Sequence, residues 1–157
     1  MTYHSVLAVF DAGSPPDAIV LSATAIAKRF DARVLGVVGA RPHAPLYFAE
    51  GYAGEELIKT LKKEAESRIR QIKTAVDKPL YNEGVPHQWC PQEPANPDYV
   101  LTMCQAADIV VTCRGDFQRS GSNPSTGNLI MQAGRPVLLV SVDAKVAGLD
   151  RIVIAWK

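Results

Sequence analysis

The chain has 157 residues, and 17 Lys and Arg against 16 Asp and Glu give it a formal net charge of +1. This length is accounted for by one domain of about 150 residues. The balanced charge excludes a general nucleic-acid binder, which needs a basic excess on one face. Hydrophobic residues make up 47% and charged residues 21%, a globular composition with enough apolar surface for one core.

The cysteines and the amino terminus indicate a cytoplasmic protein. Cys90, Cys104 and Cys113 form no Cys-x-x-Cys pair, and their odd number fits reduced thiols. No basic residues precede the first apolar run, as a secretory signal would require. The apolar runs are strand-sized, so no membrane span is expected. The three histidines are scattered without metal-ligand spacing, so no metal site is expected.

The first part of the chain reads as strand, helix and strand. Residues 5–10 and 33–38 are short apolar runs, typical of strands covered on both faces. Between them, Ser14 is expected to cap a helix over 15–30. The apolar residues near one face of this helix are Ala18, Leu21, Ala25 and Ile26.

A long helix is the clearest local prediction, over residues 55–76. Its apolar residues recur at spacings of three and four, which is typical of one buried face. These residues are Leu57, Leu61, Ala65, Ile69, Ile72 and Val76. The loop before the helix, 39–54, carries an aromatic cluster over 45–52. This cluster is expected to cover a ligand, meet a partner chain or pack beneath its own helix.

The second part of the chain continues the alternation. Strands are predicted over 85–89, 107–112 and 136–140, and helices over 97–106 and 124–133. Five strands separated by four helices predict a doubly wound, mostly parallel α/β sheet with helices on both faces. Ligands of such sheets bind beyond the carboxyl ends of the strands, which predicts a site at Asp11, the 39–54 loop and the 113–122 loop.

The segment 110–127 is the richest in ligand-binding chemistry. A strand ends there, then glycines, hydroxyl side chains and Arg114 follow before a helix opens. Backbone N–H groups at such a place suit a phosphate or another anion. The segment has neither Gly-Lys-Ser/Thr nor Gly-x-Gly-x-x-Gly, so it is not a P-loop or a dinucleotide fingerprint. Simple turns and caps are the alternative explanation.

Several segments together resemble the universal stress protein family, over residues 5–141. They are the strand ending in Asp11, the second strand with its preceding turn (32–38), Ala-Asp and its strand (107–111), Arg114-Gly115, and the last strand with its preceding turn (133–140). The resemblance implies a Rossmann-like, adenine-nucleotide-binding fold, a regulatory role in stress response, ATP or another adenine nucleotide as ligand, and a homodimer or pairing with a second domain of the same family.

The resemblance also implies a set of nucleotide-binding residues, although the glycine pattern of the family is altered here. Thr112 stands at the first glycine and Gly115 at the second. Counting forward places Ser125-Thr126 at the final pair of the motif, whereas counting back from Pro136 places 123–124 there. The implied set is Asp11, Val38, Thr112, Arg114, Gly115, Ser125 and Thr126. A turn or cap role is the alternative for Asp11.

No catalytic set emerges from the residues. Asp11 and Asp116 make a conceivable acid/base pair without a third group. A thiol nucleophile would need Cys113 or Cys90 beside His87 or His43. A regulatory, ligand-sensing domain is therefore the leading hypothesis. A nucleotide-hydrolysing enzyme and a purely structural interaction domain are the alternatives.

The end of the chain repeats the look of its beginning. Residues 1–141 make the expected domain, and 142–157 form a linker and an extra strand. Residues 154–156 can be aligned with 8–10, which is expected if a second repeat of the domain starts there. The alternatives are a sixth strand at a sheet edge or exchange with a partner chain.

Overall fold

The computed structural model describes residues 2–11, 15–39, 55–90, 98–113 and 126–143. The aromatic cluster of 45–52 and the extra strand within 144–157 lie outside these ranges and stay predictions. The elements within them are β1 (Ser5–Asp11), α1 (Asp17–Phe30), β2 (Arg33–Gly39), α2 (Glu55–Asn82), β3 (His87–Trp89), α3 (Tyr99–Cys104), β4 (Ile109–Cys113), α5 (Thr126–Gln132) and β5 (Val137–Val140).

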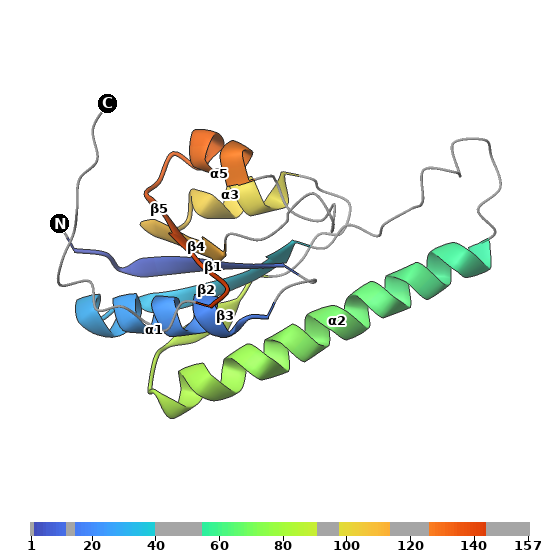
Figure 1. Ribbon diagram of the computed structural model, residues 1–157, viewed down its shortest axis with the longest axis horizontal. Coiled ribbons are helices and arrows are strands. Elements are labelled where there is room, and N and C mark those ends of the chain that lie inside the picture. Colours follow the sequence, from blue (N-terminus) through green and yellow to red (C-terminus); the bar gives the residue numbers. More distant parts are fainter. Residues whose placement is uncertain (1, 12–14, 40–54, 91–97, 114–125, 144–157) are drawn as a thin grey trace.

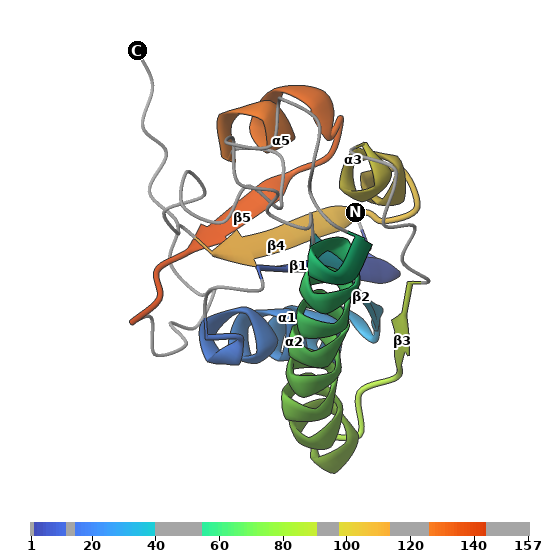
Figure 2. The same ribbon diagram turned by 90° about the vertical axis from the view of Figure 1, so that its right-hand side faces the viewer.

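The strands form one parallel sheet in the order β3-β2-β1-β4-β5. Central β1 pairs with β2 from Ser5↔Arg33 to Asp11↔Gly39 and with β4 from Val6↔Ile109 to Val9↔Thr112. Helices α1 and α2 lie on one face and α3 and α5 on the other (Figures 1 and 2). The predicted doubly wound α/β fold is therefore confirmed.

The core has two halves, because successive side chains of a strand point to opposite faces of the sheet. Val6, Ala8 and Phe10 of β1 pack in the half beneath α1 and α2. Leu7 and Val9 pack in the half beneath α3 and α5. All five are at most 1% exposed, which explains the uninterrupted apolar run that predicted this strand.

Helix α1 differs in two details from its prediction. It starts at Asp17, two residues after the predicted start, with Pro16 at the N-cap position and no side-chain cap bond. The predicted cap residue, Ser14, lies outside the described residues. The buried residues are Ala18, Ile19, Val20, Ala23, Ile26 and Ala27. Leu21 is 47% exposed, so its place on the buried face is also wrong. The buried face follows the spacing 19, 23, 26 and 27, which leaves Leu21 to one side.

Helix α2 runs six residues beyond the predicted 55–76 and contains Pro79 near its end. The proline cannot donate to the carbonyl of Ala75, but Ala75 is exposed, so water can serve that carbonyl. Leu80 continues the buried stripe of Ile72 and Val76 and is 2% exposed. The described side chains between 59 and 68 are all exposed, and this part of α2 reaches past the sheet (Figure 1).

Trp89 fastens α2 to the edge of the sheet. Its indole Nε1–H donates to Asp77 Oδ1 at 2.6 Å, and its ring centroid lies 5.6 Å from that of Phe10. A Cβ at position 36 would lie 3.0 Å from Cε3 of Trp89. Gly36 therefore lets the indole lie directly against β2, which no larger residue would allow without a shift.

Asp108 joins β1 to the segment before β4 at the amino edge of the sheet. Its Oδ2 accepts from the backbone N–H of His4 at 2.8 Å, from the N–H of Ser5 at 2.9 Å and from Ser5 Oγ at 3.0 Å. These hydrogen bonds lower the pKa of the Asp108 carboxyl, and the one from the His4 backbone has the largest effect. The folded protein therefore stabilises the ionised form of this carboxyl group.

Replacing Asp108 with asparagine is expected to lower the free energy of unfolding by about 1–2 kcal/mol at neutral pH. Because the folded pKa is lowered, the stabilisation is present above the usual Asp pKa and is lost as pH falls towards the folded value. Urea unfolding at about pH 7 and about pH 3 measures the difference, which should shrink in acid. A difference that stays constant would contradict the assignment. Asp31→Asn, at an exposed left-handed position, is the control.

Candidate functional site

The order in which strands are added to the sheet changes side at the junction of β1 and β4. From β1 the chain adds β2 and β3 on one side, and then crosses to β4 and β5 on the other. Helix α1, the next element after β1, and helix α5, the next described element after β4, lie on opposite faces of the sheet. Parallel α/β sheets bind ligands at the carboxyl ends of the strands at such a point. The strand-end residues at this edge are Asp11, Gly39, Trp89, Cys113 and Val140.

Asp11 and Val38 lie on neighbouring strands at this edge. Asp11 ends β1 opposite Gly39, and Val38 pairs with Phe10 one position earlier. Val38 is 4% exposed, whereas Asp11 is half-buried. The two predicted residues thus lie on adjacent strands at the carboxyl edge, and the side chain of Val38 packs with Phe10 in the half of the core beneath α1 and α2.

Thr112 bridges the two central strands. Its side chain is 1% exposed, and its Oγ1–H donates to the carbonyl oxygen of Val9 at 3.3 Å. The alternation along β4 places it on the face covered by α3 and α5, because Val110 packs there. The hydroxyl therefore bonds to the backbone of β1, and the side chain is buried between β1 and β4.

The Cys113 thiol is influenced by the charges of two carboxylates, which the sequence analysis did not predict. It is 4% exposed. Burial raises the pKa of its thiol, and the charges of Asp11 and Asp143 raise it further. Asp11 is the last residue of β1 and Asp143 comes three residues after β5, and these two strands flank β4. A search for acidic residues at strand ends, which indicated Asp11, could therefore also have indicated Asp143. The thiol stays protonated near neutral pH, which is unfavourable for a nucleophile.

The remaining residues of the implied set are placed in part. Thr126 is the first residue of α5 and is half-buried. Arg114, Gly115 and Ser125 lie outside the described residues, so their predicted contact with a nucleotide stays a prediction.

His87 faces an acid and a carbonyl. Its Nδ1 lies 3.0 Å from the carbonyl oxygen of Val85 and its Nε2 lies 3.4 Å from Asp77 Oδ1. Cys90 packs in the half of the core beneath α3 and α5, whereas Cys113 packs beneath α1 and α2. The described partners of His87 are thus a carbonyl and a carboxylate and not a thiol, and burial raises the pKa of Cys90 as well. His43 and Asp116 lie outside the described residues.

Metal ligands do not gather in the described ranges, where no group of three or more His, Cys, Asp or Glu side chains could hold an ion. The helices described are also too short or too polar to cross a bilayer. All three cysteines are free thiols.

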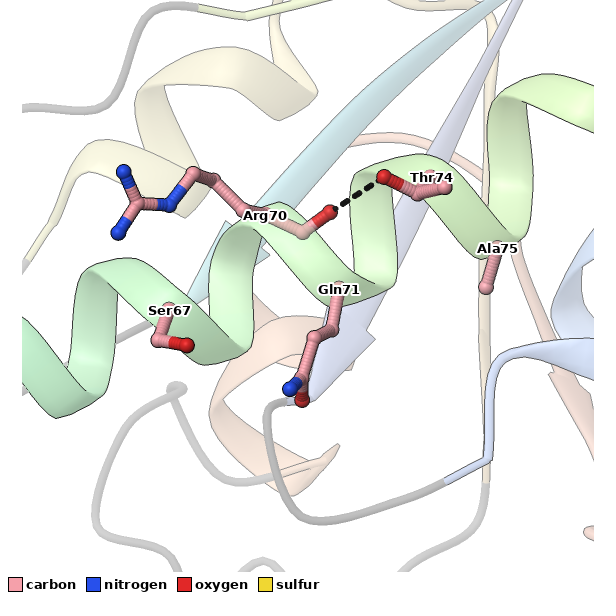
Figure 3. Close-up of a pocket in the computed structure, with 5 residues that line it drawn as sticks. All are labelled: Ser67, Arg70, Gln71, Thr74 and Ala75. Atoms are coloured by element: carbon pink, nitrogen blue, oxygen red, sulfur yellow. Dashed lines mark hydrogen bonds between the residues drawn. The ribbon is translucent and has the colours of Figure 1, made fainter.

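Two surface hollows accompany α2. One, of about 440 Å³, is lined by Ser67, Arg70, Gln71, Thr74 and Ala75. Figure 3 shows that Arg70 points away from Gln71, and that Thr74 Oγ1 donates to the carbonyl oxygen of Arg70, at 3.0 Å. These residues come from successive turns of one helix and supply no convergent polar groups. The second hollow, of about 490 Å³, lies between α1 and the end of α2, with Leu21 and Pro79 in its wall. Neither hollow is at the carboxyl edge of the sheet.

Comparison with solved structures identifies the same fold in universal stress proteins. The universal stress protein UspA from Lactobacillus plantarum is 16% identical with a TM-score of 0.62, over 89% of this chain and 99% of that one. A universal stress protein in complex with cAMP is 19% identical with a TM-score of 0.52, over 91% and 100%.

A universal stress protein family protein from Arabidopsis thaliana, with AMP bound, is 12% identical with a TM-score of 0.55, over 88% of this chain and 91% of that one. Neither a family model nor a curated protein sequence matches the chain. At these identities the likeness shows the fold, and the fold expected from the resemblance is confirmed.

Proposed function

We propose that this chain, which has the fold of the universal stress proteins, is a regulatory protein of that family that binds an adenine nucleotide between the carboxyl ends of β1, β2 and β4. The observation that carries the proposal is that Asp11 and Val38 lie on adjacent strands at the carboxyl edge, next to the point where the strand order changes side. Two proteins of the same fold were solved with cAMP and with AMP, which supports an adenine nucleotide as ligand.

The residues suit the two halves of a nucleoside. A strand-end carboxylate such as Asp11 accepts hydrogen bonds from ribose hydroxyls, as acidic residues do in other nucleotide-binding sheets. The backbone around buried Val38 offers an apolar wall and peptide groups to the base. Arg114, Ser125 and Thr126 are the proposed phosphate partners.

The proposal makes the protein a binding module without catalysis of its own. At the described edge, burial and the charges of Asp11 and Asp143 raise the pKa of the Cys113 thiol, so the edge offers no activated nucleophile. Self-association belongs to the proposal, because β5 is an edge of the described sheet and Leu139 and Val142 are 37% and 42% exposed. The free thiols support a cytoplasmic location.

Asp11→Asn is expected to weaken adenine-nucleotide binding by about ten-fold or more, because a charge-assisted hydrogen bond is worth about 1.5–3 kcal/mol. Calorimetric titration of the full chain with AMP and with cAMP measures the loss. Asp31→Asn is the matched control, because Asp31 starts the turn into β2 at the opposite edge of the sheet. Absence of binding to either ligand by the unaltered chain would contradict the proposal.

A further inference from the structure

A cluster of polar side chains joins the edge strand β3 to helix α2. His87 and Trp89 are two positions apart on the strand, so their side chains leave on the same face of the sheet. Both reach one carboxylate oxygen of the helix. Trp89 Nε1–H donates to Asp77 Oδ1 at 2.6 Å, and His87 Nε2 lies 3.4 Å from the same atom. The indole is a permanent donor, whereas the hydrogen on the imidazole nitrogen depends on pH.

The other ring nitrogen of His87 fixes where the hydrogen of the neutral ring lies. Nδ1 is 3.0 Å from the carbonyl oxygen of Val85, and a carbonyl oxygen can only accept a hydrogen bond. The neutral ring therefore carries its hydrogen on Nδ1, which leaves the lone pair of Nε2 towards the carboxylate of Asp77. Protonation of the ring places a hydrogen on Nε2 and turns this contact into an attractive, charge-assisted one.

The charged residues around His87 leave Asp77 as its ion-pair partner in the described part of the chain. The others come from the elements that pack against the ring or lead into it: Arg33 of β2, Lys73 and Lys78 of α2, and Glu83 of the turn before β3. Glu83 is paired with Lys28 of α1, and the two lysines of α2 are exposed. On β2, apolar Val34 is opposite His87, and Arg33 lies on the alternate face.

We infer that His87 and Asp77 form a pH-sensitive latch, which holds the edge strand β3 to helix α2 more tightly in mild acid than at alkaline pH. Histidine changes its charge between about pH 8 and about pH 5, and the two side chains are 20% and 39% exposed, so protons reach them from solvent. The folded chain favours the protonated ring, so the stabilisation is present in mild acid and is lost as pH rises. The latch needs no nucleotide and goes beyond the function proposed above.

The latch acts on a short strand. β3 has three residues and pairs in the described sheet with β2, from Val34↔His87 to Gly36↔Trp89. Trp89 shares the Asp77 carboxylate and packs against Phe10 of β1. When His87 is neutral, the hydrogen bond of Trp89 still joins the strand to the helix. Deprotonation is therefore expected to loosen this contact and not to unfold the chain.

A double-mutant cycle in the full chain tests the latch, with His87→Gln, Asp77→Asn and the combined variant unfolded in urea at about pH 5.5 and about pH 8. At the lower pH the coupling should raise the folding equilibrium constant about three-fold, as is typical of a partly exposed ion pair, and at the higher pH it should disappear. Lys28→Gln with Glu83→Gln is the matched control cycle, because neither group titrates in this range. Its coupling should be the same at both pH values.

Nuclear magnetic resonance of the unaltered chain gives an independent readout. At about pH 8 the ring-nitrogen shifts of His87 should show the hydrogen on Nδ1 and none on Nε2. A neutral ring with its hydrogen on Nε2 would overturn the inference, because Nε2 would then donate to Asp77 without a charge. Coupling of equal size at both pH values, or none at the lower one, would overturn it as well. The tautomer needs no substitution, so it decides the case if a variant does not fold.

Discussion

Replacing Phe10 with alanine is expected to lower the free energy of unfolding by about 3–5 kcal/mol, the cost typical of deleting a buried aromatic ring. Phe10 is 1% exposed and lies against Trp89, with ring centroids 5.6 Å apart. Its neighbours in the core come from both helices of that face, through residues such as Ile19 and Val76. The cavity would open where the central strand, the edge strand and α2 meet.

Chemical denaturation followed by circular dichroism measures this loss. Met131→Ala is the control, because Met131 is 83% exposed and its replacement should change the free energy by less than about 0.5 kcal/mol. A Phe10→Ala loss below about 1 kcal/mol would mean that the ring is not part of a close-packed core.

Replacing Leu80 with alanine is expected to cost about 2–5 kcal/mol, as for other buried leucines. Leu80 is 2% exposed and is the last residue of the stripe that holds α2 to the sheet. Its neighbour Tyr81 is 80% exposed, so Tyr81→Ala tests the same turn of helix without the core contact.

The two variants at this turn should separate clearly in urea unfolding. Tyr81→Ala should stay within about 0.5 kcal/mol of the parent, since its ring is in solvent. Equal losses in the two variants would show that the helix turn itself, and not the buried leucine, is what the substitutions damage. If Leu80→Ala were as stable as the parent, burial of Leu80 would not be what holds α2 against the sheet.

Local patterns were sufficient to predict most of the elements. The uninterrupted apolar residues of β1 and β2 predict strands buried on both faces, and both are found within one residue of the expected ends. Helix α2 continues past Val76, the last apolar residue of the predicted stripe, although Pro79 is unfavourable inside a helix. There the burial of Leu80, one turn after Val76, outweighs the loss of one hydrogen bond at the exposed Ala75 carbonyl.

Contacts across the sheet lie beyond such patterns. The strand-end rule indicated Asp11 and Val38, but the approach of Asp143 to Cys113 depends on β5 lying beside β4. Likewise, the bond from Trp89 to Asp77 needs the edge strand to sit beneath α2. Periodicity reports which face of an element is buried and carries no information about which neighbour covers it.

The pairing of β1 has a consequence for the order in which the chain folds. Its partners on β2 are less than 30 positions away, at Ser5↔Arg33, whereas Ser5 and Asp108 are 103 positions apart. Closing the longer loop costs more chain entropy and slows the search. We expect the β1–β2 unit with α1 to form first and to keep one flank of β1 open until residues 109–113 arrive. During synthesis on the ribosome, that open flank is the part of the nascent chain most exposed to mispairing.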